Sequence, residues 1–342
     1  MTSGLSDSAS ATAVGAGAAA ASDTAAGGGS GTAVRGGLSG RTGRAGGGTR
    51  GVRRRTPSAA PFLVPNLVLC VVFLFYPLVM AFVISQRHQE TLGEPYDVGL
   101  SNYLDLARDP VFWEALRNTA VFTVATVPVG MALGLGVAVL LNGVLPGRTL
   151  YRAIIFLPLV ISGAATGVLG SWIFDQYNGF VNKALAAVGV QGPAWQSEGT
   201  WAMLSIILMT IWIRLGFDMI IYLAGLQGIE PHLYEAASLD GAGAWATFRR
   251  ITVPLLGPST FFLLVMNLLY SFQVFDTVYA MTGGGPGNST TMLVNYAYKT
   301  GFDERGPGQL GYAATIGVVL YVLTLAITAI QWRTSRTRDE AG

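Results

Sequence analysis

Two ionisable residues lie inside a long apolar run, where a charge is costly and is usually kept for a function. Arg214 and Asp218 are four positions apart, so on a helix they share one face and can neutralise each other. Two interpretations follow from this spacing. The pair can line a path through which a polar solute passes, or it can be self-neutralising and only pack against another helix.

Side chains suited to a hydroxylated solute occur in the same apolar run and in a later one. Such solutes are held by amides, hydroxyls and aromatic rings, so these groups should lie along one side of a helix. The later run carries a set at three-residue steps, namely Asn267, Tyr270, Gln273 and Asp276. The earlier run carries Trp212, Gly216 and Met219. Packing and interhelical hydrogen bonding are the alternative role for both sets.

The sequence offers no convincing set of residues for catalysis or metal binding. A phosphate-binding P-loop needs glycines followed by lysine, and neither of the two lysines meets that requirement. His88 and His232 are expected on opposite faces of a membrane, and Cys70 is the single cysteine, so we predict no metal site and no disulfide. The glycine-rich stretch 282–287 lacks lysine and is expected to be a flexible loop or a docking surface. We therefore predict a chain that is not an enzyme and binds no cofactor itself.

These residues belong to a chain with the composition of a membrane protein. Of its 342 residues, 51% are hydrophobic and 12% are charged, about half the charged fraction typical of soluble domains. Six apolar runs are long enough to cross a bilayer as helices. They are residues 62–84, 118–141, 153–174, 201–225, 255–281 and 310–331. We predict an all-α, multi-pass protein of the plasma (cytoplasmic) membrane, embedded in the lipid bilayer and without a nucleic-acid partner.

Basic residues set the expected orientation and the division of the chain. If both termini are cytoplasmic, 14 basic residues fall on inner segments and six on outer loops, in agreement with the positive-inside rule. Residues 1–56 are rich in Gly, Ala and Arg and are expected to be a disordered cytoplasmic tail. The other predicted parts are 57–115, the first transmembrane helix and an outer loop; 116–332, a core of five transmembrane helices; and 333–342, a cytoplasmic tail.

The inner loop 226–254 has the signals of two short helices joined by a glycine. Pro231 suits the first turn of a helix, and Gly241 suits the end of one. A second helix can run over about 244–251, and Pro254 then begins the next apolar run. The sequence therefore predicts a bent elbow at the inner face.

The first helix of this elbow offers a small, smooth surface with acidic edges. Ala236 and Ala237 supply the small side chains, and Glu235 and Asp240 lie beside them. Such a surface suits insertion into a groove on another protein. An ordinary amphipathic connector on the membrane surface is the alternative.

The elbow resembles the signature loop of ABC importer permeases, which reads Glu-Ala-Ala, three residues, Gly, nine residues, Ile-x-Leu-Pro. This chain has residues 235–237, Gly241, Ile251 and Pro254 at those positions, with Val253 in place of Leu. The resemblance extends over about 115–335. The stretches 226–241, 272–276 and 282–287 are similar to the carbohydrate-uptake branch, and in particular to the maltose-type large permease subunit.

The resemblance implies a type I importer permease fold and a division of labour among subunits. A second, homologous permease completes the pathway as a heterodimer, two ATPase subunits bind ATP and Mg, and an external binding protein delivers a sugar. The coupling role falls on Glu235, Ala236, Ala237, Asp240 and Gly241. By register, the positions that contact sugar are Trp212, Gly216, Met219, Asn267, Gln273 and Val274, so the expected substrate path joins these to Arg214, Asp218, Tyr270 and Asp276.

Other cargoes and another transporter class stay open at this stage. The same permease class carries glycerol phosphate, polyamines or peptides. A phosphate would need several basic groups in the path, and only Arg214 qualifies. A polyamine would need acids, and Asp218 and Asp276 are too few to decide. An ion-coupled carrier is less favoured, because the two halves of the chain show no convincing internal repeat.

Overall fold

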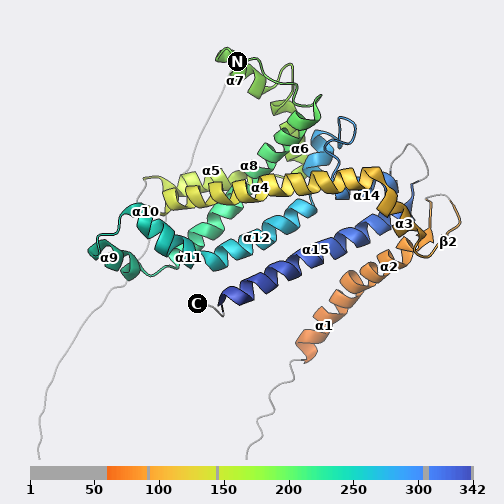
Figure 1. The fold of residues 1–342 in the computed structure, drawn as a ribbon, viewed down its shortest axis with the longest axis horizontal. Helices are drawn as coiled ribbons and strands as arrows, with labels where there is room; N and C mark the ends of the chain where they lie inside the picture. The colour runs from red at the N-terminus through yellow and green to blue at the C-terminus, as the bar shows by residue number, and fades with distance from the viewer. Residues whose placement is uncertain (1–59, 91–92, 144–145, 303–307, 340–342) are drawn as a thin grey trace, which may run out of the picture. The chain divides into compact units, whose positions relative to one another are not determined.

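The structure of the protein is a computed structural model that describes residues 60–90, 93–143, 146–302 and 308–339, so the predicted tail 1–56 lies outside the described residues. The described residues all fall in one unit, Ala59–Gly342. Helices make up almost all of this unit, with a short hairpin of β1 (Arg87–His88) and β2 (Tyr96–Asp97). Elements α9 (Pro231–Leu239) and α10 (Ala244–Thr247) lie at one end of the helices, and α3 (Ser101–Arg108) and β2 lie at the opposite end (Figure 1).

Four continuous helical segments are long and apolar enough to cross a membrane. The first, Leu63–Ser85, runs through α1 (Ala60–Cys70), a π-helical turn (Val71–Phe75) and α2 (Tyr76–Ser85). The others are α4 (Pro110–Asn142), α8 (Gly199–Gln227) and α15 (Leu310–Asp339). These confirm helices at the first, second, fourth and sixth apolar runs. Helix α4 begins earlier than predicted, because the Asp109 side chain accepts a hydrogen bond from the Val111 N–H and caps it.

The other two apolar runs, 153–174 and 255–281, each contain a sharp bend that the run lengths did not indicate. Helix α5 (Arg148–Val160) meets α6 (Gly163–Ile173) at 101°. The bend follows Pro158, and Ser162 starts α6 by accepting a hydrogen bond from the Ala165 N–H. If each bent pair counts as one span, the described part of the chain has up to six.

The second bend lies between the segment Ala244–Leu255 and α12 (Gly257–Phe272), which meet at 64°. Pro258 in the first turn of α12 suits a fresh helix start. Helix α12 ends at Phe272, and a separate short helix, α13 (Asp276–Met281), follows. The predicted run 255–281 is therefore three pieces.

Close packing of α4, α8 and α12 forms the core that holds the central residues. One cluster of fully buried side chains joins these three helices and includes Ala138, Met219 and Leu263. A second cluster lies beyond it and includes Phe122, Ile206 and Val278. Helix α8 is the most enclosed of the candidate spans, with 56% of its apolar window buried. It is therefore the axis around which the other helices pack.

The glycine-rich loop 282–287, expected to be a flexible loop or a docking surface, is held by side-chain hydrogen bonds. Gly283, Gly284 and Gly287 have positive φ angles, which only glycine adopts readily. The Thr290 hydroxyl donates to the Gly285 carbonyl at 2.7 Å, and the Thr291 hydroxyl donates to the Gly284 carbonyl at 3.0 Å. The loop then leads into α14 (Leu293–Phe302). Threonine hydroxyls thus satisfy two backbone carbonyls of the glycine-rich loop.

Candidate functional site

The predicted elbow is present and has the expected two-helix form. Helix α9 (Pro231–Leu239) begins with its proline, and the chain reverses at Gly241, whose φ is +75°. The Ala242 N–H donates to the Ala237 carbonyl at 2.9 Å, which closes the end of α9. Helix α10 (Ala244–Thr247) and a π-helical turn (Phe248–Thr252) follow.

The exposed face of α9 differs from the predicted coupling set in two residues. Glu235, Ala236, Asp240 and Gly241 are exposed, but Ala237 is only 8% exposed and faces the bundle. The sequence reasoning missed Leu239, which is 89% exposed. The signal was available, because Leu239 is four positions after Glu235 and so lies on the same helix face. An exposed leucine beside an acidic residue is what a docking helix presents to a groove.

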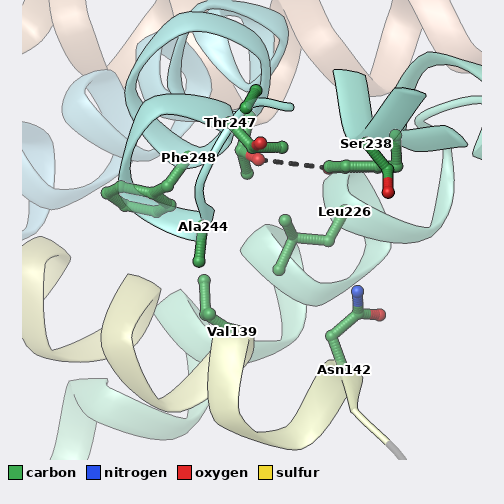
Figure 2. A pocket seen from close by; sticks show the side chains of 10 residues that line it. Val139, Asn142, Leu226, Ser238, Ala244, Thr247 and Phe248 are labelled. Atoms are coloured by element: carbon green, nitrogen blue, oxygen red, sulfur yellow. Dashed lines mark hydrogen bonds between the residues drawn. The ribbon is translucent and has the colours of Figure 1, made fainter. Parts of the chain in front are cut away.

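A hydrogen bond joins the two halves of the elbow to each other. The hydroxyl groups of Tyr234 and Thr252 lie 3.2 Å apart and join α9 to the π-helical turn. A hollow of about 310 Å³ separates this contact from the ends of α4 and α8. Figure 2 shows Val139, Leu226 and Ala244 meeting across it from three different elements. The two halves of the elbow are thus bonded to each other, and a hollow lies between them and the ends of α4 and α8.

Arg214 and Asp218 come together as predicted, but through a third residue. The Asn267 amide oxygen accepts from Nε and Nη2 of Arg214 at 3.2 and 3.0 Å, and its nitrogen donates to Asp218 Oδ1 at 2.8 Å. The ion pairs found among the described residues do not include Arg214 with Asp218. Asn267 of α12 therefore links two charges of α8.

Two aromatic rings complete this central cluster. The Arg214 guanidinium lies 4.6 Å from the ring centre of Phe217 and 4.5 Å from that of Tyr270. Asp218 is 1% exposed, and Asn267 is 5% exposed. The cavity at the cluster has a volume of only about 10 Å³, too little for a sugar and at the lower limit for a water. The cluster is closed in this conformation.

The remaining residues predicted for the path do not join the cluster. Gln273 and Asp276 are exposed but lie beyond the end of α12, so they do not continue its face. Met219 and Val274 are buried among apolar side chains. Gly216 packs against the backbone of α5, since a Cβ there would come 2.6 Å from the Ile155 carbonyl oxygen. Trp212 is 38% exposed on α8.

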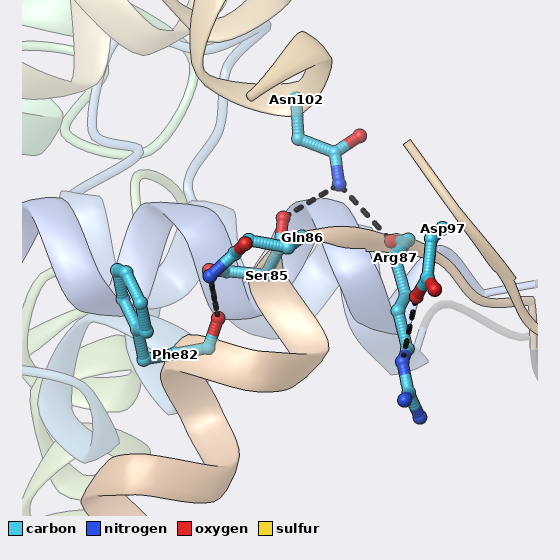
Figure 3. A network of polar contacts seen from close by, with 6 residues as sticks. All are labelled: Phe82, Ser85, Gln86, Arg87, Asp97 and Asn102. Atoms are coloured by element: carbon cyan, nitrogen blue, oxygen red, sulfur yellow. Dashed lines mark hydrogen bonds and ion pairs between the residues drawn. The ribbon is translucent and has the colours of Figure 1, made fainter. Parts of the chain in front are cut away.

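A polar network fixes the opposite end of the molecule (Figure 3). The Asn102 amide of α3 (Ser101–Arg108) donates to the carbonyls of Ser85 and Arg87 at 2.8 and 3.0 Å. The Arg87 Nε donates to Asp97 Oδ1 at 3.1 Å, which closes the hairpin. Thr315 of α15 also donates to the Ser85 carbonyl, at 3.1 Å. These bonds join α2, α3 and α15.

Asp109 anchors a second network at this end. The hydroxyl groups of Tyr296 in α14 and Tyr312 in α15 both donate to its carboxylate. Burial acts to raise the pKa of Asp109, but these bonds and those from the Val111 and Phe112 N–H groups outweigh it, so the pKa lies below its ordinary value. Burial and the bond to Asp109 raise the pKa of Tyr296. The carboxylate thus stays ionised while it holds three elements.

Within the described parts of the chain, no three His, Cys, Asp or Glu residues are grouped so that they could hold a metal ion. The central cluster offers hydrogen bonds and ring faces, and the elbow offers a docking surface.

Comparison with known proteins agrees with this arrangement. The chain is 35% identical over 283 residues to the sulfoquinovosyl glycerol transport system permease protein SmoG of Agrobacterium fabrum, covering 82% of this chain and 91% of the relative. It is 34% identical over 288 residues to the sn-glycerol-3-phosphate transport system permease protein UgpA of the same species, covering 82% of this chain and 96% of the relative.

The fold has a counterpart among solved structures. A chain of a bacterial ABC transporter that imports the acidic polysaccharide alginate superposes with a TM-score of 0.70 at 26% identity, covering 81% of this chain and 94% of that chain. Residues 108–336 match the model of the family described as binding-protein-dependent transport system inner membrane component. These residues contain the elbow, the central cluster and five of the six predicted spans, so the chain belongs to that family of ABC importer permeases.

Proposed function

We propose that this chain is the permease subunit through which an ATP-driven importer moves a sugar across the plasma membrane. The observation that carries the proposal is the elbow itself. Helix α9 presents Glu235, Ala236 and Leu239 on an exposed face and turns at Gly241, whose φ of +75° suits glycine. A relative that transports a sulfoquinovosyl compound and a structural neighbour that imports alginate support a carbohydrate cargo.

The elbow receives force from a separate ATPase. Leu239 enters an apolar groove on that subunit, and Glu235 and Asp240 make polar contacts at the groove's edge. Ala236 permits close approach, while the buried Ala237 packs α9 against the bundle. Gly241 sets the angle between α9 and α10. ATP and Mg are bound by the partner, and this chain holds no cofactor.

The full importer contains two permeases, two ATPase subunits and an external binding protein. A solved bacterial alginate ABC transporter is in complex with a periplasmic protein that carries an alginate pentasaccharide, which supports the last of these. Both bent helix pairs count as spans, which gives six. Both termini and the elbow are cytoplasmic, as the distribution of basic residues indicates.

The sugar passes beside the central cluster when the helices separate. The small cavity at Arg214, Asp218 and Asn267 fits a closed state, and opening between this chain and a second permease widens it. The half-buried Tyr270 ring and the Arg214 guanidinium then meet hydroxyl groups of the sugar. Gln273 and Asp276, exposed past the end of α12, form the outer approach.

Glycerol phosphate is the second candidate cargo, favoured by the sn-glycerol-3-phosphate permease among the relatives. The cluster argues against it. Arg214 is already linked through Asn267 to the buried carboxylate of Asp218, so the two charges balance. A phosphate is recognised best by several basic groups. Uptake of labelled sugars in competition with sn-glycerol-3-phosphate separates the two cargoes.

The coupling role is tested at Leu239, because a substitution at this exposed side chain should not disturb folding. We expect Leu239→Asp to abolish co-purification with the ATPase and to abolish uptake. Leu100→Asp is the matched control, since Leu100 is 64% exposed at the opposite end. It should leave ATPase binding intact. Normal uptake by the Leu239→Asp variant would refute the coupling role.

A further inference from the structure

A basic hollow lies on the second half of the elbow and has no role in the proposed coupling. Its volume is about 430 Å³, and Trp245, Ala246, Arg249 and Arg250 line it. Trp245 is 72% exposed, and both arginines are exposed. None of the ion pairs found in the described ranges includes either arginine. Two positive charges and an indole ring therefore face the same open space.

The π-helical turn explains why both arginines reach this hollow. Arg249 is four positions after Trp245, so it lies on the same side of the helix. In a regular helix Arg250 would point elsewhere, but the backbone here widens, and the Val253 N–H donates to the Phe248 carbonyl five residues back. The Trp245 ring stacks on Phe248 with centroids 5.7 Å apart, which fixes the indole at the rim.

The hollow lies where the polar elbow gives way to apolar surface. The next residues expose large apolar side chains, with Val253 at 42% and Leu255 at 47%. Helix α12 continues this with Phe262 at 46% and Met266 at 37%. Tryptophan and arginine are the residues enriched at the boundary between lipid chains and the cytoplasm. The position suits a lipid headgroup whose chains extend along the exposed apolar side chains.

We propose that Trp245, Arg249 and Arg250 form a binding site for the phosphate-bearing headgroup of an anionic phospholipid of the inner leaflet. The proposal rests on the cytoplasmic placement of the elbow given above. Basic pockets at the cytoplasmic side of membrane helices bind such headgroups. The ATPase is a weaker candidate, because a soluble partner at this hollow would leave the adjacent Val253 and Leu255 uncovered, whereas a lipid covers both regions.

The test measures lipid preference in the assembled importer. The complex is reconstituted in phosphatidylcholine vesicles without nucleotide or cargo, and electron spin resonance compares spin-labelled phosphatidylglycerol with spin-labelled phosphatidylcholine at the protein surface. We expect Arg249→Gln with Arg250→Gln to reduce the preference for phosphatidylglycerol at least about fivefold, because each basic residue near an anionic surface contributes about that factor. Arg249→Lys with Arg250→Lys should keep most of it.

Arg148→Gln is the matched control, because Arg148 is exposed at the same end of the molecule but outside the hollow. It should not change the preference. An unchanged lipid preference in the double Gln variant would overturn the proposal. If that variant also lost the ATPase, the hollow would be a contact site for the ATPase. Since no transport is measured, failure of the sugar proposal leaves this result unaffected.

Discussion

Gly134 of α4 lies so close to Asp218 of α8 that a Cβ added at Gly134 would come 2.5 Å from the Asp218 Cβ. Backbone atoms of Asp218 and Met219 would lie 3.2 Å away, so side-chain rotation cannot relieve the contact. Gly130, one turn earlier, would place a Cβ 3.4 Å from an Asp218 carboxylate oxygen. The small residues of α4 therefore bring one helix backbone against a buried carboxylate.

Gly134→Ala tests this close approach. Alanine favours a helix over glycine by about 1 kcal/mol, but here the added methyl must push α4 and α8 apart, and such overpacking costs about 1–3 kcal/mol. We expect a lower thermal unfolding temperature in detergent. Gly136→Ala is the control, since a Cβ there meets nothing within 4 Å, and it should be neutral or stabilising. Equal melting temperatures for the two variants would contradict the packing described.

Asn267→Leu tests the link between the two buried charges. The change removes the acceptor of Arg214 and the donor to Asp218, and breaking a buried charged network costs about 3–5 kcal/mol. We expect strong destabilisation in thermal unfolding and loss of uptake. Adding Arg214→Met and Asp218→Leu should restore much of the stability, because an apolar replacement has no charge to bury, but should not restore uptake. Normal uptake by the triple variant would exclude the cluster from the sugar path.

Asp109→Asn tests the carboxylate that holds α4, α14 and α15. Because the folded pKa of Asp109 lies below its ordinary value of 3.8, its contribution to stability is fully present above about that pH and is lost as the pH falls through the lower folded value. We expect the wild-type melting temperature to lose this contribution below about pH 4. The Asn variant should be less stable at pH 7 and should lack that acid-dependent part. Melting curves from pH 7 to pH 3 measure the difference.

A single cysteine can report the side of the membrane on which the elbow lies. Cys70 is the one cysteine of the chain, so Cys70→Ser gives a cysteine-free background. When that background is expressed without the ATPase, Leu239→Cys should react with an impermeant maleimide only in inside-out vesicles, because Leu239 is 89% exposed on this chain. Leu100→Cys should react only in right-side-out vesicles. Labelling of Leu239→Cys from outside intact cells would refute the proposed orientation.

Local patterns predicted the continuous helices and the elbow well. Apolar run length located α8, and Pro231 and Gly241 located the ends of the first elbow helix, because caps and proline act within one turn. The same approach missed the bends after Pro158 and before α12. A proline inside an apolar run is tolerated in some helices and breaks others, and neighbouring helices decide which.

The central site was predicted only in part, because half of it depends on tertiary contacts. The four-residue spacing placed Arg214 and Asp218 on one face, but no pattern within α8 indicates that Asn267 joins them. The three-residue repeat through Gln273 and Asp276 assumed a continuous helix, whereas α12 ends at Phe272. Leu239 was not included in the predicted coupling set, because its exposure depends on how α9 packs and not on its residue type.

The segment Leu63–Ser85 has none of its apolar window buried by the rest of the chain. Phe73 is 73% exposed and Leu74 is 62% exposed. An exposed apolar helix of this length would drive aggregation in water, so lipid, detergent or another protein must cover it. The choice of detergent is therefore the first step in handling this protein. A detergent that covers this helix poorly should let the protein precipitate even while its helices remain folded.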